Sequence, residues 1–157
     1  MATTQTTYSE TIALPPAGTW ANMTNRDADS LVCETAAGIA FGVAVSQGTA
    51  ANGAVIGGAS AAVFRGITIR DITIPPTNGE EYAEGDVMAV ATEGDIWVTV
   101  GGDVTVGGDV TFASTTGVLS SAGTGGSQFA ISGARWMTAA SSGARAKVRL
   151  SGHVPAA

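Results

Sequence analysis

Apolar residues alternate with small or polar residues along most of the chain after residue 30, which is the period of a β-strand. Between Gly38 and Ser46, for example, branched and aromatic side chains alternate with alanine and glycine. Similar runs lie at 61–74, 87–92, 95–100, 103–106, 109–113, 129–132, 135–139 and 145–151. No amphipathic helix of three turns is visible. The pattern therefore predicts about ten or more short strands.

Gly-Asp followed by Val or Ile occurs four times, at residues 85–87, 94–96, 102–104 and 108–110. Glycine adopts positive φ at little cost, and an Asp side chain can accept hydrogen bonds from nearby backbone amides. We therefore expect a turn at each Gly-Asp pair, leading into a strand. Strands this short and densely punctuated predict an all-β fold, either a jelly-roll-like sandwich or a compact β-barrel.

The first 30 residues differ from the rest of the chain. They are rich in threonine, contain Pro15-Pro16 and show no sustained hydrophobic period. We expect residues 1–30 to form an extended N-terminal arm and residues 31–157 to form a single β domain. Trp20 is a candidate anchor of this arm, either on its own domain or on a neighbouring subunit.

The surface of this domain must be covered largely by uncharged residues. Charged residues make up only 13% of the chain, and Lys147 is the one lysine. Threonine, serine, alanine and glycine together exceed half of the sequence. Such a surface is inexpensive to bury against other subunits, because few long side chains lose rotamer freedom. The same composition also fits a soluble β domain with few lysines.

Charge, cysteine and hydropathy exclude several classes of protein. The net charge of −6 disfavours nucleic-acid binding, which needs a basic surface. A single cysteine, Cys33, excludes an internal disulfide. Residues 35–64 carry no charge, but polar turns at Ser46–Thr49 and Asn52-Gly53 interrupt them, so we expect no membrane span. The residues before Arg26 lack the features of a secretory signal.

Candidate catalytic and metal-binding groups are sparse. His153, the one histidine, lies near the end of the chain, away from any recognisable nucleophile motif. Asp95, Asp103 and Asp109 could offer oxygen ligands to calcium, but a role as turn residues is the favoured explanation. The sequence thus predicts no catalytic residue, no metal site and no cofactor.

The last predicted strand carries three basic residues on one face. Arg145, Lys147 and Arg149 alternate with apolar residues, so their side chains point the same way. This row could dock on an acidic neighbour. The alternative is a solvent-facing edge strand that its charges protect against aggregation.

Five stretches together resemble the structural cement (capsid decoration) proteins of tailed bacteriophages: 62–71, 79–86, 93–98, 133–137 and 148–153. The resemblance covers roughly residue 34 to the C-terminus. It implies a non-enzymatic, β-rich protein on the outer surface of the virion, made in the cytoplasm of the bacterial host. Such a protein bridges major capsid subunits as a homodimer or homotrimer. The family offers no catalytic residues or cofactor to carry over.

Candidate contact residues follow from this implied role. In the arm they are Thr3, Thr6, Tyr8 and Trp20, and in the last strand they are Arg145, Lys147 and Arg149. An extended arm can reach an adjacent subunit, and repetition over a shell supplies avidity.

Two other functions stay open at this point. One is a carbohydrate-binding β-sandwich on a virion or cell surface, with Trp97, Trp136 or Tyr82 as a stacking platform. The other is a hydrolase that uses the acidic loop at residues 80–84, which contains three glutamates.

Overall fold

The structure, a computed structural model, describes residues 13–23, 25–58, 63–74, 79–121 and 127–151. These residues form strands and turns, with no helix among them. The strands are β1 (Asp27–Cys33), β2 (Ile39–Ala40), β3 (Ala44–Gln47), β4 (Gly53–Ile56), β5 (Phe64–Thr68), β6 (Glu81–Tyr82), β7 (Val87–Thr99), β8 (Asp109–Ala113), β9 (Leu119–Ser120), β10 (Gln128–Trp136) and β11 (Arg145–Leu150). Across these ranges, no helix has the length and apolar character that a membrane crossing requires.

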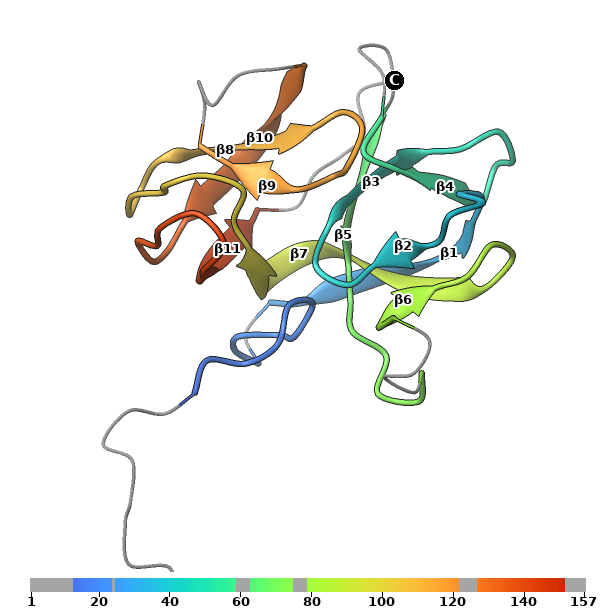
Figure 1. Cartoon of the computed structure of the whole chain (residues 1–157), viewed down its shortest axis with the longest axis horizontal. Helices are drawn as coiled ribbons and strands as arrows, with labels where there is room; N and C mark the ends of the chain where they lie inside the picture. The colour runs from blue at the N-terminus through green and yellow to red at the C-terminus, as the bar shows by residue number, and fades with distance from the viewer. Residues whose placement is uncertain (1–12, 24, 59–62, 75–78, 122–126, 152–157) are drawn as a thin grey trace, which may run out of the picture.

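Five strands close into a barrel at one end of the molecule (Figure 1). Their order is β1-β4-β3-β5-β7, and β1 also pairs with β7, which closes the ring. The β1–β4 pair is parallel and the other pairs are antiparallel. A small sheet of β2 and β6 lies beside the barrel. This barrel is the first lobe of the molecule.

The second lobe continues the same sheet beyond β7 in the order β11-β10-β8-β9 (Figure 1). A parallel bridge between Val100 and Leu119 returns β9 to the residue that follows β7. β7 therefore belongs to both lobes. Its residues 87–93 pair with β1 and 90–91 also with β5, whereas residues 94–99 pair with β11.

The change of partner in β7 occurs at Gly94. This residue has a φ of +118°, and a Cβ there would lie 2.8 Å from the ring of Trp20. Residues 18–21 run beside the second half of β7 and hydrogen-bond to it, with Gly18 N donating to Trp97 O and Ala21 N to Asp95 O. Residues 18–21 of the predicted arm thus bind along the second half of β7, with a single β-bridge between Trp20 and Ile96.

Each lobe has its own buried cluster. The barrel interior contains Leu31, Val45, Met88 and Val90, and Tyr82 covers it with its hydroxyl donating to Ile69 O. The second cluster fills the other lobe around Trp136 and extends to the barrel wall at β5. There the rings of Phe64 and Phe112 lie 5.6 Å apart, which joins the two cores through apolar packing.

Backbone hydrogen bonds fasten the lobes where two glycines meet. Ala44 N donates to Gly117 O and Gly58 N donates to Ser114 O between the lobes, while Gly57 N donates to Ala44 O within the barrel. Gly57 and Gly117 both have positive φ, and a Cβ at Gly57 would lie 2.2 Å from Ser114 O. Only glycine fits a backbone approach this close.

The all-β expectation is confirmed, in its barrel form. The expected strands at 87–92 and 95–100 are one continuous strand, β7. The expected strand at 129–132 lies within β10, and the one at 135–139 begins in β10 and extends past its end at Trp136. The expected strand at 103–106 is a single bridge between Val104 and Ala140. The expected boundary of the arm after residue 30 falls inside β1. Residues 1–12 lie outside the described residues.

We predict that Gly57→Ala destabilises the protein by about 3 kcal/mol or more, because a left-handed backbone and an overpacked junction act together. Gly107→Ala is the matched control. Gly107 also has positive φ, but a Cβ there meets no atom within 4 Å, so a loss of about 1–2 kcal/mol is expected. Urea unfolding of both variants measures the difference. Equal losses would show that the junction contributes no steric constraint.

Candidate functional site

The basic row on β11 lies in the middle of the sheet. β11 pairs with β7 on one side and with β10 on the other, so the edge-strand alternative is wrong. Register places Arg145 opposite Thr99, Lys147 opposite Trp97 and Arg149 opposite Asp95. The three cations therefore share one face of the sheet with the second half of β7.

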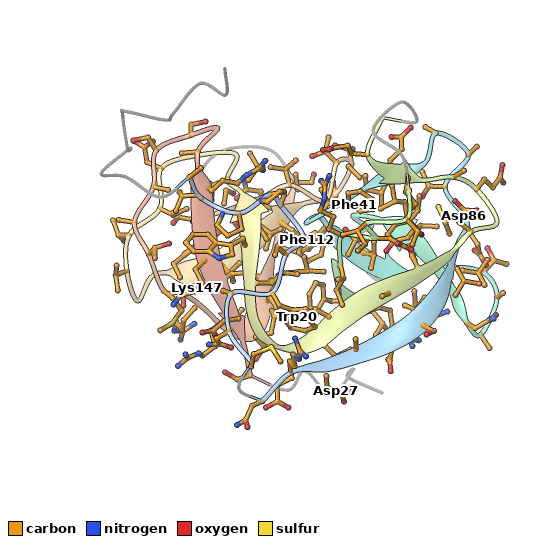
Figure 2. The ribbon with its side chains drawn as sticks, turned by 90° about the horizontal axis from the view of Figure 1, so that it is seen from below. Trp20, Asp27, Phe41, Asp86, Phe112 and Lys147 are labelled. Atoms are coloured by element: carbon orange, nitrogen blue, oxygen red, sulfur yellow. The ribbon has the colours of Figure 1, made fainter. Side chains whose placement is uncertain are left out.

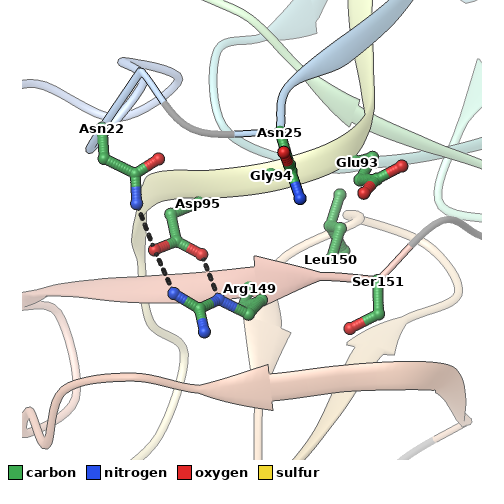
Figure 3. A pocket seen from close by; sticks show the side chains of 8 residues that line it. All are labelled: Asn22, Asn25, Glu93, Gly94, Asp95, Arg149, Leu150 and Ser151. Atoms are coloured by element: carbon green, nitrogen blue, oxygen red, sulfur yellow. Dashed lines mark hydrogen bonds and ion pairs between the residues drawn. The ribbon is translucent and has the colours of Figure 1, made fainter.

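Arg149 is committed to an ion pair within the lobe. Its Nε and Nη2 donate to the two carboxylate oxygens of Asp95 at 2.7 and 2.9 Å. Asn22 Nδ2 donates to the same carboxylate at 2.6 Å (Figure 3). The hydrogen bond from Arg149 is the main reason that the pKa of Asp95 lies below its ordinary value, and burial opposes it. The guanidinium of Arg149 is thus already paired with a carboxylate of its own chain.

A shallow pocket of about 270 Å³ opens beside this ion pair at the bend of β7. Asn22, Asn25, Glu93 and Ser151 line it together with Arg149 (Figure 3). Asn25 is one of two described non-glycine residues with positive φ, and its backbone turns the chain from residues 18–21 into β1. The pocket is polar, but no constellation of nucleophile and base lies in it.

Arg145 lies at a second cluster, where the two lobes meet. Its guanidinium contacts Thr99 Oγ1, and together with Arg70 and Glu80 it lines a pocket of about 170 Å³. Arg70 donates to Glu80 at 2.7 Å and lies over the ring of Phe41. The hydrogen bond from Arg70 holds the pKa of Glu80 below its ordinary value, and the nearby charge of Arg145 adds to this effect.

Lys147 is the least engaged member of the row. Its backbone amide donates to Thr138 Oγ1, and its side chain lies beside Trp97 across the strand pair. In the described ranges, neither Lys147 nor Arg145 has a carboxylate within ion-pair distance.

Trp20 packs on its own domain. Its backbone bridges to Ile96, its ring packs partly buried against the core of the second lobe, and the guanidinium of Arg26 lies 5.9 Å above it. Among the predicted contact residues, Thr3, Thr6 and Tyr8 lie outside the described residues.

Burial removes two of the three aromatic platforms considered for carbohydrate binding. Trp136 and Tyr82 are 0% and 2% exposed, so neither ring can stack on a sugar. Trp97 is half-buried and alone stays accessible among the three. The sequence pattern missed this because a strand aromatic can face either side of the sheet.

Several of the acidic groups considered for chemistry have structural partners in the described part of the chain. A glycosidase acid needs a raised pKa, whereas the pKa of Glu80 is lowered by its arginine partner. The three aspartates considered for calcium have separate partners: Arg149 for Asp95, the amide of Ser142 for Asp103 and Arg135 for Asp109. No group of three or more potential metal ligands occurs in the described part of the chain.

We predict that Arg149→Met lowers the melting temperature at pH 7 and reduces the dependence of stability on acid. The folded pKa of Asp95 is lowered, so the unfolded state binds more protons in acid. This contribution is present above the unfolded carboxyl pKa of about 3.9 and is lost as pH falls through the folded value. Removing the guanidinium removes the cause of the shift.

The matched control for that variant is Arg135→Met. Arg135 pairs with Asp109 at 2.6 Å, but both side chains are more than half exposed, so little stability should be lost. Thermal unfolding between pH 3 and pH 7 compares the two. Equal melting temperatures of the two variants at every pH would mean that the Asp95–Arg149 pair stabilises the fold no more than a surface ion pair does.

Comparison with known proteins adds two findings. A family model described as "Structural cement protein (E217 gp24/Pam3 gp6)" matches residues 4–151. Five chains from solved structures also match, among them one from "The capsid of Myoviridae Phage XM1". That chain is 20% identical with a TM-score of 0.73, and the alignment covers 91% of this chain and 94% of the other. No curated protein sequence matches.

At 20% identity the structural likeness shows a shared fold. The family match spans nearly the whole chain, including all but the first three residues of the predicted arm and both lobes. It implies a structural, non-enzymatic role in association with phage capsid components. The chain belongs to the family of phage structural cement proteins.

Proposed function

We propose that this protein is a non-enzymatic capsid cement protein that binds the outside of a tailed-phage head and bridges major capsid subunits. The single observation that carries the proposal is the family match over residues 4–151. The site geometry is compatible with it, because Glu80, Asp95 and Asp109 form ion pairs with arginines, and the described residues contain no group of three or more potential metal ligands.

The two ends of the chain segment before β1 have different roles in this proposal. Residues 18–21 anchor the segment to β7 through backbone hydrogen bonds. The contact residues Thr3, Thr6 and Tyr8 precede that anchor. Their function would be to reach the capsid surface or an adjacent subunit while the anchored part fixes the starting point. Pre-fixing one end lowers the ordering entropy that binding must overcome.

Self-association as a homodimer or homotrimer is the second part of the proposal. The low content of charged residues, 13%, leaves broad areas of small side chains that are inexpensive to desolvate. Repetition of the oligomer over a shell would let individually modest contacts add up to stable decoration.

We predict that the full chain co-sediments with undecorated capsids at micromolar concentration. The decorated shells should also resist heating better than bare shells, because ligands that bind only the assembled state stabilise it. Sedimentation with densitometry and thermal release of packaged DNA measure the two effects. Absence of co-sedimentation at tens of micromolar protein would contradict the proposal.

Removal of residues 1–12 should weaken capsid binding by about tenfold or more, because a few side chains often supply most of the binding energy of an interface. The fold should stay intact. The cut must not extend to residue 30, since β1 begins at Asp27 and Gly18 is hydrogen-bonded to β7. The control is Thr3→Ala/Thr6→Ala/Tyr8→Ala in the full chain, which keeps the segment and removes the side chains. Binding equal to wild type in the truncated protein would exclude a role for the segment.

A further inference from the structure

The first part of β1 has an open edge. β1 pairs with β7 along residues 27–32, but its pairing with β4 on the other side begins only at Val32. In the described part of the chain, no strand pairs with residues 27–31 on that side. Figure 2 shows Asp27 at the margin of the molecule, where β1 is the outermost ribbon. This stretch of β1 is therefore a sheet edge at the surface.

The backbone groups on this edge belong to Ala28 and Ser30. Val32 N donates toward the β4 side of the strand, whereas Cys33 N donates toward the β7 side. Backbone groups alternate in direction along a strand, so those of Ala28 and Ser30 point the same way as those of Val32. The amide of Ala28 donates to the carboxylate of Asp27. The ladders of the described strands supply no partner for the carbonyl of Ala28 or for the amide and carbonyl of Ser30.

Small side chains leave this backbone accessible. Residues 27–30 are all exposed, and the side chains of Ala28 and Ser30 are short. Sheet edges that are protected against other chains commonly carry lysine or proline, and β1 contains neither. An accessible edge is a template for an extended segment of another chain, which adds as a further strand through main-chain hydrogen bonds.

The outer face of the β1–β7 pair can receive side chains of such a segment. Register places Ser30 opposite Ala89 and Val32 opposite Val87, and Val87 is 67% exposed. A pocket of about 310 Å³ is lined by Ser30, Val87 and Ala89 among others. A strand added to the edge would continue this face, so its alternate side chains would lie beside Ser30 and near the pocket.

The beginning of β1 also carries two carboxylates that repel each other. Asp27 lies directly opposite Glu93 of β7, and neither has an ion pair within the described ranges. Like charges directly opposite each other destabilise a sheet. Arg26 adjoins Asp27 in the chain, but its guanidinium lies over the ring of Trp20. A cation on an added segment would relieve this repulsion.

We propose that an extended segment of the major capsid protein adds as a strand to the edge of β1 at Ala28 and Ser30, with a basic side chain beside Asp27 and Glu93. This inference rests on the proposed function and names the surface that would bind a capsid subunit. A second copy of this chain fits the edge less well, because its net charge of −6 would bring mostly carboxylates. Each site forms only a few main-chain hydrogen bonds, and repetition over a shell supplies avidity.

The charge part is tested with Asp27→Asn/Glu93→Gln and undecorated capsids. Removal of two like charges should raise the melting temperature of the free protein, whereas its affinity for capsids should fall about fivefold or more. A purely structural role of the two carboxylates would not move the two measurements in opposite directions. Co-sedimentation titrations in about 50 and 500 mM salt should show a smaller salt dependence for this variant than for the wild type.

The matched control is Glu84→Gln/Asp109→Asn, which has the same net charge as the test variant. It removes two exposed carboxylates that lie outside β1 and its partner residues on β7. This control should bind capsids like the wild type.

The backbone part is tested with Ser30→Pro. Proline removes the amide hydrogen and is tolerated at an open sheet edge. We expect capsid affinity to fall about tenfold or more, because main-chain hydrogen bonds give an added strand its affinity. Ser30→Ala keeps the amide and should bind like the wild type. Circular dichroism melting checks the fold of every variant.

Hydrogen–deuterium exchange of the wild type needs no substitution. The amide of Ser30 should exchange quickly in the free protein and slowly on capsids. If Ser30→Pro does not fold, this measurement and the charge variant decide.

A wild-type protein that does not bind capsids would overturn the proposed function and this inference with it. If the wild type binds, three results would each overturn the inference alone: unchanged affinity of the charge variant, unchanged affinity of a folded Ser30→Pro variant, or unchanged exchange at Ser30. Slow exchange at Ser30 in the free protein would assign the edge to this chain or a second copy, and would also overturn it.

Discussion

The structure depends on one strand that serves two lobes. β7 is 13 residues long, and its hydrogen-bond partners change at Gly94 from β1 and β5 to β11 and the segment at residues 18–21. A strand that closes a barrel with one half and begins a second sheet with the other must bend without breaking its hydrogen-bond ladder. Gly94 permits the bend, because its positive φ and missing Cβ leave room for the ring of Trp20.

This shared strand explains why the segment before β1 cannot be a free arm along its whole length. The second half of β7 is paired with β11 on one side only, and residues 18–21 satisfy the other side. Leaving that edge open would expose unpaired backbone groups to other chains. The same arrangement separates the chain into an acidic barrel and a second lobe with a basic face, since the residues before and after the bend differ in charge.

The sequence pattern predicted most of the strands, but it predicted a turn at every Gly-Asp pair, and this is correct only for some of them. Gly85-Asp86 is a turn as expected, with Asp86 accepting from a nearby amide. Gly94-Asp95 has the same letters but lies inside β7, because Asp95 is 2% exposed and its partner is Arg149, 54 residues away. The local sequence cannot distinguish a Gly-Asp turn from a Gly-Asp pair inside a strand, since the partner of Asp95 is an arginine far away in the chain. The same limit applies to the basic row on β11: alternation predicted its shared face, but not that Arg149 would be committed internally.

Charge screening limits the range over which the net charge and the local charges of one copy act on another. At physiological ionic strength the Debye length is about 8 Å, so the net charge of −6 repels a neighbour only weakly at longer range. Contact is different, because groups that lose water feel each other at low effective dielectric. Two barrel lobes brought together would oppose carboxylates such as Glu84 and Asp86, whereas a barrel lobe against the β7–β11 face opposes carboxylates to Lys147. The acidic barrel lobe and the basic residues of β11 are therefore complementary in charge, and Val87 adds exposed apolar area to the barrel lobe.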